Sequence, residues 1–368
     1  MLVKKVKRIK AFAEPVQLEN GRSSYKNIQL EIVSQDLGKF VAPGYVRAKM
    51  HYLGICGTDI HLVSTNPETG LIKTSAPCFI PDSGRIIGHE GSGEILACGE
   101  GVSHIEKGDL VAFESLFSCG QCDICRRGKF NQCRNAKLMG LQFDGLFSEI
   151  VEVPAILARK ITNFTYSPED LKAASCLEPA GVAFLACENT QITFSDRVVV
   201  LGAGPIGAYC AMIAQTFFGV TEVVVVEPVE FRRELSKKWS TRAISPEELL
   251  KEEFSFDVLI EASGDMTTLA QAFKRIEPNG RVCVLARSGK NLNLDSMDHM
   301  ISNNITILGS RGHLGGYFER MLPFIKNGQF PILDVVTKEL NGLDELLSCL
   351  NSPENIIHEQ CKIICKIS

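Results

Sequence analysis

Hydrophobic residues between positions 197 and 309 fall into short unbroken runs, which are separated by longer amphipathic segments. The runs are rich in β-branched residues and occupy residues 197–201, 222–227, 257–261, 281–285 and 306–309. The segments 206–218 and 231–239 are typical of helices. Parallel strands that are buried on both faces form continuous apolar runs, and alternating strands and helices build such a sheet. We therefore predict an α/β fold with a doubly wound parallel sheet in this part of the chain.

The first 165 residues show a different pattern, in which short β-type runs are bounded by glycine or proline. These runs occupy residues 46–52, 93–97, 109–113 and 147–153, and they predict an irregular, mainly β domain. Ser167 and Pro168, followed by two acidic residues, have the order expected for a helix N-cap and first turn. Near the end of the chain, residues 343–350 are typical of a helix and residues 356–367 predict a final strand.

The overall composition is that of an ordinary folded protein. A chain of 368 residues exceeds the usual size of one domain, so two domains are expected. The formal net charge is −4 with no basic block, which argues against a nucleic-acid partner. The N-terminus is basic but lacks the apolar region of a secretory signal, and no apolar run approaches membrane-spanning length. We expect a cytoplasmic chain whose scattered cysteines stay reduced.

Four of the 14 cysteines form a tight cluster with the spacing C-x2-C-x2-C-x7-C. The cluster consists of Cys119, Cys122, Cys125 and Cys133. Four thiolates so close in sequence can surround one Zn²⁺ as a tetrahedron. Reduced thiols or local disulfides are the alternatives, but adjacent C-x2-C pairs favour a metal. A closed site with four sulfur ligands has no open position, so this zinc is predicted to stabilise a lobe and to take no part in chemistry.

A dinucleotide-binding fingerprint follows the first run of the parallel sheet. The segment 198–207 has the sequence VVVLGAGPIG, in which G-x-G-x-x-G ends a strand and opens a helix. Glycines at these positions allow a tight turn and close approach to a pyrophosphate, which then lies at the helix N-terminus. The residues predicted to bind the cofactor here are Gly202, Gly204, Pro205, Ile206 and Gly207.

Glu227 ends the second run of the parallel sheet, 25 residues after Gly202. An acidic residue at this place accepts hydrogen bonds from the adenosine ribose and repels a 2′-phosphate, which favours NAD over NADP. Arg232 and Arg233 follow closely and could instead accommodate that phosphate. NADP therefore stays open as the alternative cofactor.

Three further residues are candidate ligands of a second metal. Cys56, His89 and Glu178 are each weak candidates alone, because a lone cysteine or histidine is more often a buried structural residue. Their surroundings are more specific. Cys56 lies in the sequence GICGTDIH, His89 follows Gly88 and precedes Glu90, and Glu178 precedes Pro179.

These motifs resemble those of the zinc-dependent medium-chain alcohol dehydrogenases. Residues 88–102 match the pattern GHE-x2-G-x5-G-x2-V of that family, residues 54–59 match the motif of its first metal ligand, and the four-cysteine cluster follows at the expected place. The subgroup of sorbitol, glucose and related polyol dehydrogenases is the most similar. The resemblance implies a GroES-like catalytic domain over residues 1–165, a Rossmann domain over residues 166–309, and a return to the catalytic domain over residues 310–368.

The resemblance also implies a catalytic zinc held by Cys56, His89 and Glu178. Cys176 competes with Glu178 for the third position, but in a helix these two side chains would point about 200° apart, and the motif favours Glu178. Glu90 is implied either as a further ligand or as a carboxylate beside the metal. Mixed ligands with an open position are typical of a catalytic zinc.

Zinc in such a site acts as a Lewis acid that favours loss of the proton from a substrate hydroxyl. Thr58 matches the hydroxyl that relays this proton in the family, and His61 is close enough in sequence to extend the relay. An ordinary exposed histidine is the alternative interpretation of His61.

The function implied is NAD-linked oxidation of a secondary alcohol in a small polyol, sugar or cyclitol. A threonine-type or amino-alcohol dehydrogenase is the alternative, and a non-catalytic binding protein on the same fold is a remote one. The resemblance further implies a homodimer or homotetramer. Residues 64–85 and 311–313 are expected to form the loops that determine substrate specificity.

Overall fold

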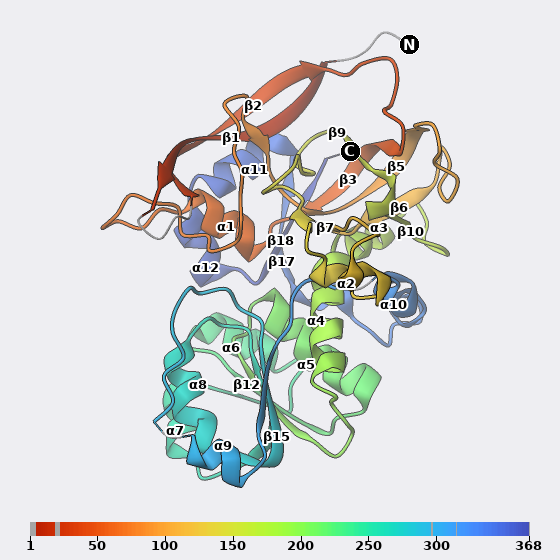
Figure 1. Ribbon diagram of the computed structural model, residues 1–368. Helices are drawn as coiled ribbons and strands as arrows, with labels where there is room; N and C mark the ends of the chain where they lie inside the picture. Colours follow the sequence, from red (N-terminus) through yellow and green to blue (C-terminus); the bar gives the residue numbers. More distant parts are fainter. Residues whose placement is uncertain (1–4, 19–22, 296, 314, 368) are drawn as a thin grey trace.

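The computed structural model describes residues 5–18, 23–295, 297–313 and 315–367, and Figure 1 shows that they form two lobes. The lower lobe in that view contains a six-stranded sheet in the order β13-β12-β11-β14-β15-β16, with every neighbouring pair parallel. The predicted doubly wound parallel sheet is therefore confirmed. Its strands are β11 (Arg197–Leu201), β12 (Glu222–Val226), β13 (Arg242–Ile244), β14 (Phe256–Glu261), β15 (Ile276–Val284) and β16 (Thr306–Gly309).

Successive residues of the central strands lie in two different cores, one on each face of the sheet. Val198 and Val200 of β11 belong to the cluster that includes α4 and α5, whereas Val199 and Leu201 belong to the cluster that includes α8. This two-sided burial explains the unbroken apolar runs in the sequence. The helices of this lobe are α4 (Leu177–Asn189), α5 (Pro205–Phe218), α6 (Glu230–Ser236), α7 (Pro246–Lys251), α8 (Met266–Ala272) and α9 (Asp298–Ser302).

The upper lobe is mainly β. Its largest sheet has seven strands in the order β10-β6-β5-β3-β18-β17, with β9 also paired to β3. The strands are β3 (Tyr45–Gly54), β5 (Glu90–Cys98), β6 (Leu110–Phe113), β9 (Ile150–Pro154), β10 (Ala158–Lys160), β17 (Val336–Asn341) and β18 (Lys362–Lys366). Because β18 pairs with β3, the end of the chain joins the same sheet as its first hundred residues.

Shorter elements complete the two lobes. Apart from β1 (Lys5–Gln17) and β2 (Ser23–Asp36), the remaining strands are β4 (Arg85–Ile86), β7 (Leu116–Phe117) and β8 (Lys137–Leu138). The remaining helices are α1 (Gly57–Val63), α2 (Asp123–Arg126), α3 (Pro168–Ser175), α10 (Tyr317–Lys326), α11 (Gly342–Leu350) and α12 (Pro353–Glu359). Short 3₁₀ turns occur at Phe130–Gln132, Ala155–Leu157, Phe273–Arg275 and Ile332–Val335.

Two parts of the chain contain elements that were not predicted. A long hairpin of β1 (Lys5–Gln17) and β2 (Ser23–Asp36) was not predicted, because one face of it is solvated and its apolar residues are interspersed with charges. The final strand expected within residues 356–367 is present as β18 (Lys362–Lys366), and it is preceded by α12, which was not predicted. Pro353 at the start of α12 has the backbone angle that a first helical position requires.

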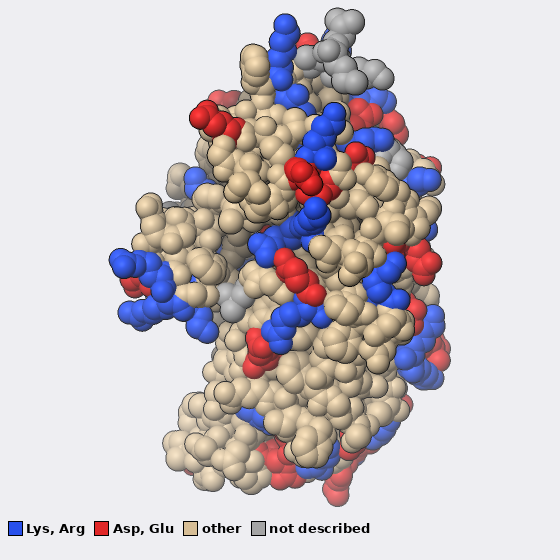
Figure 2. Space-filling view, turned by 90° about the vertical axis from the view of Figure 1, so that its right-hand side faces the viewer, with Lys and Arg blue, Asp and Glu red and all other residues tan. Residues whose placement is uncertain are grey.

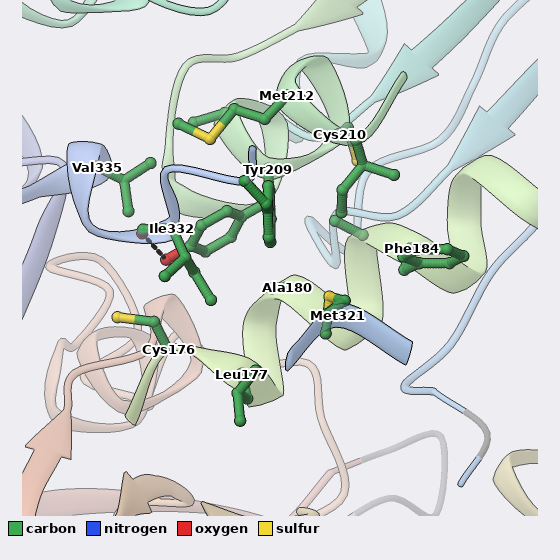
Figure 3. Close-up of a cluster of buried hydrophobic side chains, with 14 of the residues drawn as sticks. Cys176, Leu177, Ala180, Phe184, Tyr209, Cys210, Met212, Met321, Ile332 and Val335 are labelled. Atoms are coloured by element: carbon green, nitrogen blue, oxygen red, sulfur yellow. Dashed lines mark hydrogen bonds between the residues drawn. The ribbon is translucent and has the colours of Figure 1, made fainter. Parts of the chain in front are cut away.

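The helix α4 connects the two lobes and is buried along most of its length. Ser167 caps the preceding helix α3, as predicted, by accepting a hydrogen bond from the Asp170 amide. Figure 3 shows Leu177, Ala180 and Phe184 of α4 facing the side chains of α5 in one apolar cluster. This packing fixes the N-terminal end of α4, from which Glu178 extends.

The exterior carries charges of both signs. Figure 2 shows acidic and basic side chains interspersed on one face of the molecule. Among the described residues, no helix has the length and apolar character needed to cross a membrane.

The glycine-rich turn permits a direct test of the fold. A Cβ atom at Gly207 would lie 1.9 Å from the carbonyl oxygen of Gly202, whereas one at Gly204 would meet no atom within 4 Å. Because the backbone of the turn must shift, we expect Gly207→Ala to cost about 1–3 kcal/mol of stability. Gly204→Ala is the matched control and should cost much less.

The fluorescence of Trp239 can report this difference, because Trp239 is the single tryptophan of the chain and is buried. Urea unfolding of the two variants should give clearly different midpoints. Equal midpoints would contradict the close approach of α5 to the turn.

Candidate active site

A cavity of about 1250 Å³ contains the candidate site and is lined by both lobes. The upper lobe contributes α1, residues of the 64–77 segment, and the start of β5. The lower lobe contributes the glycine-rich turn and the segments that follow β14, β15 and β16. The cavity thus lies at the C-terminal ends of the parallel strands, where ligands bind in open α/β sheets.

Three predicted metal ligands lie together in this cavity. One donor atom each of Cys56, His89 and Glu90 lies within 4.8 Å of the other two. Cys56 is the N-cap of α1, two residues after the end of β3, while His89 directly precedes β5 and Glu90 is its first residue. Because β3 and β5 are neighbouring antiparallel strands, the end of one strand meets the beginning of the other. This pairing explains why residues 33 positions apart share a site.

Asp59 is an additional member of the site that the sequence analysis missed. Its carboxylate accepts a hydrogen bond of 3.0 Å from the Cys56 amide, and its other oxygen lies 3.7 Å from Nδ1 of His89. Oδ1 of Asp59 and Nδ1 of His89 are both buried and have no hydrogen-bond partner among the described residues. A small movement would let Nδ1 donate to Asp59, which would leave the other ring nitrogen free for a metal. The motif Gly-Thr-Asp after Cys56 was the available signal.

Lys362 is the second residue that was missed. Its ammonium group forms a buried ion pair with Glu90 and donates a 2.9 Å hydrogen bond to the Ile55 carbonyl oxygen. Burial alone would lower the pKa of Lys362, but the nearby negative groups, first among them Glu90, raise it. Lys362 therefore stays charged and neutralises Glu90.

Glu178 lies at the edge of this group, at the start of α4. It is buried, accepts a 2.6 Å hydrogen bond from Ser115, and lies 3.9 Å from Nε2 of His313. Burial raises the pKa of the Glu178 carboxyl to about 7. Because Glu90 is already paired with Lys362, Glu178 is the carboxylate whose negative charge is less compensated.

Cys176 is turned away from the cavity. It precedes the first residue of α4 and is not among the described residues that line the cavity. Figure 3 shows it in the apolar cluster with Tyr209 and Ile332. The geometry therefore places Glu178, and not Cys176, at the cavity, although the donor atoms that lie together among the described residues are those of Cys56, His89 and Glu90.

The donor set fits a divalent cation. Cys56, Asp59, Glu90 and Glu178 bring four potential negative charges into a buried volume, where unpaired charge is costly. Burial acts to lower the pKa of His89, but Cys56 and Asp59 raise it, and the net direction is upward. A zinc ion would compensate the same charges and leave the imidazole neutral.

The predicted proton-relay residues also line the cavity. Thr58 is half-buried in α1, with its hydroxyl oxygen 3.7 Å from the Cys56 sulfur. His61 is one turn further along the same helix, so the two side chains share a face. His61 is exposed, and desolvation at the cavity wall together with the nearby Lys73 lowers its pKa.

The four-cysteine cluster lies in a separate segment around α2, the four-cysteine lobe. The sulfur atoms of Cys119, Cys122, Cys125 and Cys133 all lie within 4.8 Å of one another. The distances from Cys133 to Cys119 and Cys122 are 3.5 and 3.9 Å. Sulfur atoms at the corners of a zinc tetrahedron are about 3.8 Å apart, given a Zn–S bond of about 2.3 Å. The cluster therefore has the size that a structural zinc requires.

The glycine-rich turn forms one wall of the cavity. Gly204, Pro205 and Ile206 line it, and Gly204 is the N-cap of α5. Gly202 has a φ of +95°, and Gly207 packs against it, so these two glycines have distinct steric reasons. Backbone amides at this helix start are available for a phosphate.

Glu227 lies beneath this turn and is buried. Its two carboxylate oxygens accept hydrogen bonds from the amides of Ala203, at 2.7 Å, and Val229, at 2.9 Å. Glu227 therefore fixes the turn, and each oxygen retains a lone pair for a further donor. Arg232 lines the cavity and is bonded to the Gln360 carbonyl oxygen, whereas Arg233 donates to the carbonyl oxygens of Glu227 and Pro228.

The raised pKa of Glu178 leads to a testable dependence of stability on pH. In protein stripped of the active-site metal, the folded state keeps the Glu178 proton up to about pH 7, while the unfolded state loses it near pH 4.5. The folded state then holds more protons between these values, so stability falls as the pH rises through this window. Between pH 5 and pH 8 the free energy of unfolding of the wild type should therefore fall by about 2–3 kcal/mol relative to that of Glu178→Gln, which has no carboxyl to titrate.

Denaturant unfolding at both pH values checks this difference. Glu169→Gln serves as the control, because Glu169 is exposed on the neighbouring helix, and it should show no such change. The burial argument would be contradicted if the unfolding free energies of Glu178→Gln and the wild type changed by the same amount between the two pH values.

Comparisons with known proteins agree with this geometry. The family model described as the alcohol dehydrogenase GroES-like domain matches residues 42–163, and the one described as zinc-binding dehydrogenase matches residues 205–327. The L-threonine 3-dehydrogenase of Pyrococcus horikoshii is 32% identical over 86% of this chain and 89% of its own length. The sorbitol dehydrogenase of Halalkalibacterium halodurans is 28% identical, covering 84% of this chain and 90% of its own.

A solved structure shows the same architecture. The crystal structure of an alcohol dehydrogenase from Escherichia coli CFT073, complexed with NADH, has 25% sequence identity and a TM-score of 0.81. The match covers 99% of this chain and 100% of that one. On these grounds the chain belongs to the zinc-binding alcohol dehydrogenase family and is an oxidoreductase.

Proposed function

We propose that the protein oxidises a secondary alcohol of a small polar molecule and transfers the hydride to NAD. The observation that carries this proposal is that one cavity holds both the donor group of Cys56, His89 and Glu90 and the wall formed by the glycine-rich turn. A substrate in this cavity can therefore contact a metal and a dinucleotide at the same time.

Cys56, His89 and Glu178 are the proposed ligands of the catalytic zinc. Glu90 is the carboxylate beside the metal, because Lys362 already neutralises it. When bound, zinc supplies Lewis acidity that favours loss of the substrate hydroxyl proton. The second proposed zinc, in the four-cysteine lobe, has no open position and stabilises that lobe.

The dinucleotide is proposed to lie along the turn at the start of α5, with its adenosine end toward β12. Glu227 carries a negative charge under the turn and retains acceptor capacity, which favours the ribose hydroxyls of NAD over a 2′-phosphate. The similar E. coli dehydrogenase structure contains NADH. Arg232 and Arg233 are occupied by carbonyl oxygens, which reduces their availability for a 2′-phosphate.

Thr58 is proposed to receive the hydroxyl proton. Its hydroxyl can accept a hydrogen bond from the substrate and donate its own proton onward. His61, one turn further on α1, is the next group toward solvent. Its lowered pKa makes it neutral near pH 7, which is the state that can accept a proton.

Two substrate classes are supported by the comparisons. A polyol or sugar derivative agrees with the sorbitol dehydrogenase relative, and an amino alcohol agrees with the L-threonine 3-dehydrogenase relatives. Both classes have a secondary hydroxyl beside further polar groups, which suits a cavity with many polar and charged side chains.

A substrate panel tests the proposal. NADH formation should be measured with polyols, aldoses, cyclitols and amino alcohols, with and without zinc, and with NADP in place of NAD. We expect zinc-dependent turnover with at least one class and slower turnover with NADP. His89→Ala should abolish turnover and lower the zinc content from two ions to one. Zinc-loaded protein that reduces neither cofactor with any compound would refute the proposal.

Substitutions at Thr58 test the proton path. Thr58→Val keeps the size of the side chain but removes the hydroxyl, so kcat should fall by roughly 10²-fold or more, the usual scale of general acid–base contributions. Thr58→Ser keeps the hydroxyl and should retain most activity. Zinc content and NAD affinity are measured in both variants. Equal kcat values for valine and serine would exclude Thr58 from the relay.

A further inference from the structure

The lining of the cavity carries more positive than negative side chains. Its basic residues are Lys73, Arg232, Arg287, Lys290, Arg311 and Lys362. Among the described residues, its acidic ones are Glu90 and Glu178, and both belong to the candidate metal centre. Lys362 is neutralised by Glu90, so the other cations face the cavity without a carboxylate that compensates them there.

Two of these cations lie on the side of the cavity opposite the adenosine end. Arg287 follows β15 and Arg311 follows β16, whereas Arg232 follows β12. In the sheet order, β11 and β14 separate β12 from β15. The dinucleotide pyrophosphate belongs at the start of α5, after β11, so its phosphates do not account for Arg287 and Arg311.

Arg311 is anchored next to the candidate metal centre. Its carbonyl oxygen accepts a 2.8 Å hydrogen bond from the Asn131 side chain. A Cβ on the adjacent Gly312 would lie 3.5 Å from the Leu116 side chain. Leu116 directly follows Ser115, whose hydroxyl is 2.6 Å from Glu178. The segment that carries Arg311 thus packs beside a proposed zinc ligand.

The guanidinium of Arg311 is half-buried and has no ion pair or side-chain hydrogen bond among the residues that the structure describes. Burial lowers its pKa and the like charge of Arg287 lowers it further, while Cys133 has a smaller opposing effect. Partly buried guanidinium groups are stable when planar oxyanions satisfy their donors. Arg311 is the half-buried member of this pair, and Arg287 is exposed after the neighbouring strand β15, so the two present guanidinium donors to an anion from adjacent strand ends.

We propose that Arg287 and Arg311 bind an oxyanionic group of the substrate, either a carboxylate or a phosphate ester, and so orient its hydroxyl toward the zinc. This inference rests on the proposed oxidation and narrows its substrates to hydroxy acids, amino acids and sugar phosphates. A neutral polyol would leave the two guanidinium groups unpaired and would bind less well.

Matched substrate pairs test the inference and distinguish its two chemical forms. The pairs are gluconate with glucitol, glucitol 6-phosphate with glucitol, and threonine with 2-amino-1,3-butanediol. We expect kcat/KM for the anionic member of at least one pair to exceed that of its neutral partner. Arg311→Gln and Arg287→Gln should each lower kcat/KM for that anion about 10- to 100-fold, with neutral partners changed less than about twofold.

Three controls accompany these variants. Arg311→Lys keeps the positive charge but not the planar guanidinium group, so its kcat/KM for the anion should fall less than that of Arg311→Gln. Arg127→Gln removes an exposed charge from the four-cysteine lobe outside the cavity lining and should change nothing. NAD affinity and zinc content should stay at wild-type values in every variant.

The outcomes separate this inference from the proposed oxidation. Equal turnover of neutral and anionic partners, or an equal loss with both in Arg311→Gln, would refute the anion site and leave the oxidation standing. An effect of Arg127→Gln as large as that of Arg311→Gln would also refute it. If no compound is oxidised, calorimetric titration of the same anions into protein loaded with zinc and NADH tests whether the anion site exists. Binding that Arg311→Gln abolishes would support the anion site alone, and absence of binding would refute it.

Discussion

The structure depends on one electrostatic constraint, which is the burial of several acidic groups at the junction of the two lobes. Asp59, Glu90 and Glu178 are each at most 5% exposed, and Cys56 lies among them. Charges removed from water in this way are tolerated when cations or hydrogen-bond donors compensate them. Lys362 compensates Glu90, whereas burial raises the pKa values of Cys56, Asp59 and Glu178, so without a cation these groups hold protons more strongly. The fold therefore supplies a set of ligands whose own repulsion favours binding of a divalent cation.

The strand topology brings these groups together from distant parts of the sequence. Cys56 follows the end of β3, Glu90 begins β5 directly after His89, and Lys362 begins β18. These three strands are neighbours in one sheet, with β3 in the middle. Glu178 arrives from the other side, on the helix that connects the lobes. The last strand of the chain is consequently needed for the charge balance of the site as well as for the sheet.

Local sequence was sufficient for the elements and residues that depend on local chemistry. The parallel strands were predictable because burial on both faces leaves unbroken apolar runs, and the glycine-rich turn because Gly202 and Gly207 each have a steric purpose. The spacing of the four cysteines indicated their cluster for a similar reason. By contrast, Lys362 is one lysine among many in the sequence, and its role arises from a strand pairing that no local pattern encodes. Asp59 lies in a recognisable local motif, but its contact with His89 depends on the pairing of β3 and β5, and His313 was expected in a specificity loop without its contact to Glu178.

The distribution of charge within the cavity suggests why a metal and arginines occur in the same site. Negative groups gather where the zinc is proposed to bind, and free guanidinium groups gather beyond Glu178. If the arginines served to neutralise the buried acids, they would form ion pairs with them, as Lys362 does with Glu90. Among the described residues, Arg287 and Arg311 form none. The cavity is therefore polarised, and a substrate with a hydroxyl at one end and an anion at the other would be held in one orientation. That orientation would present a single carbon to the dinucleotide, which is the requirement for selective oxidation of one hydroxyl among several.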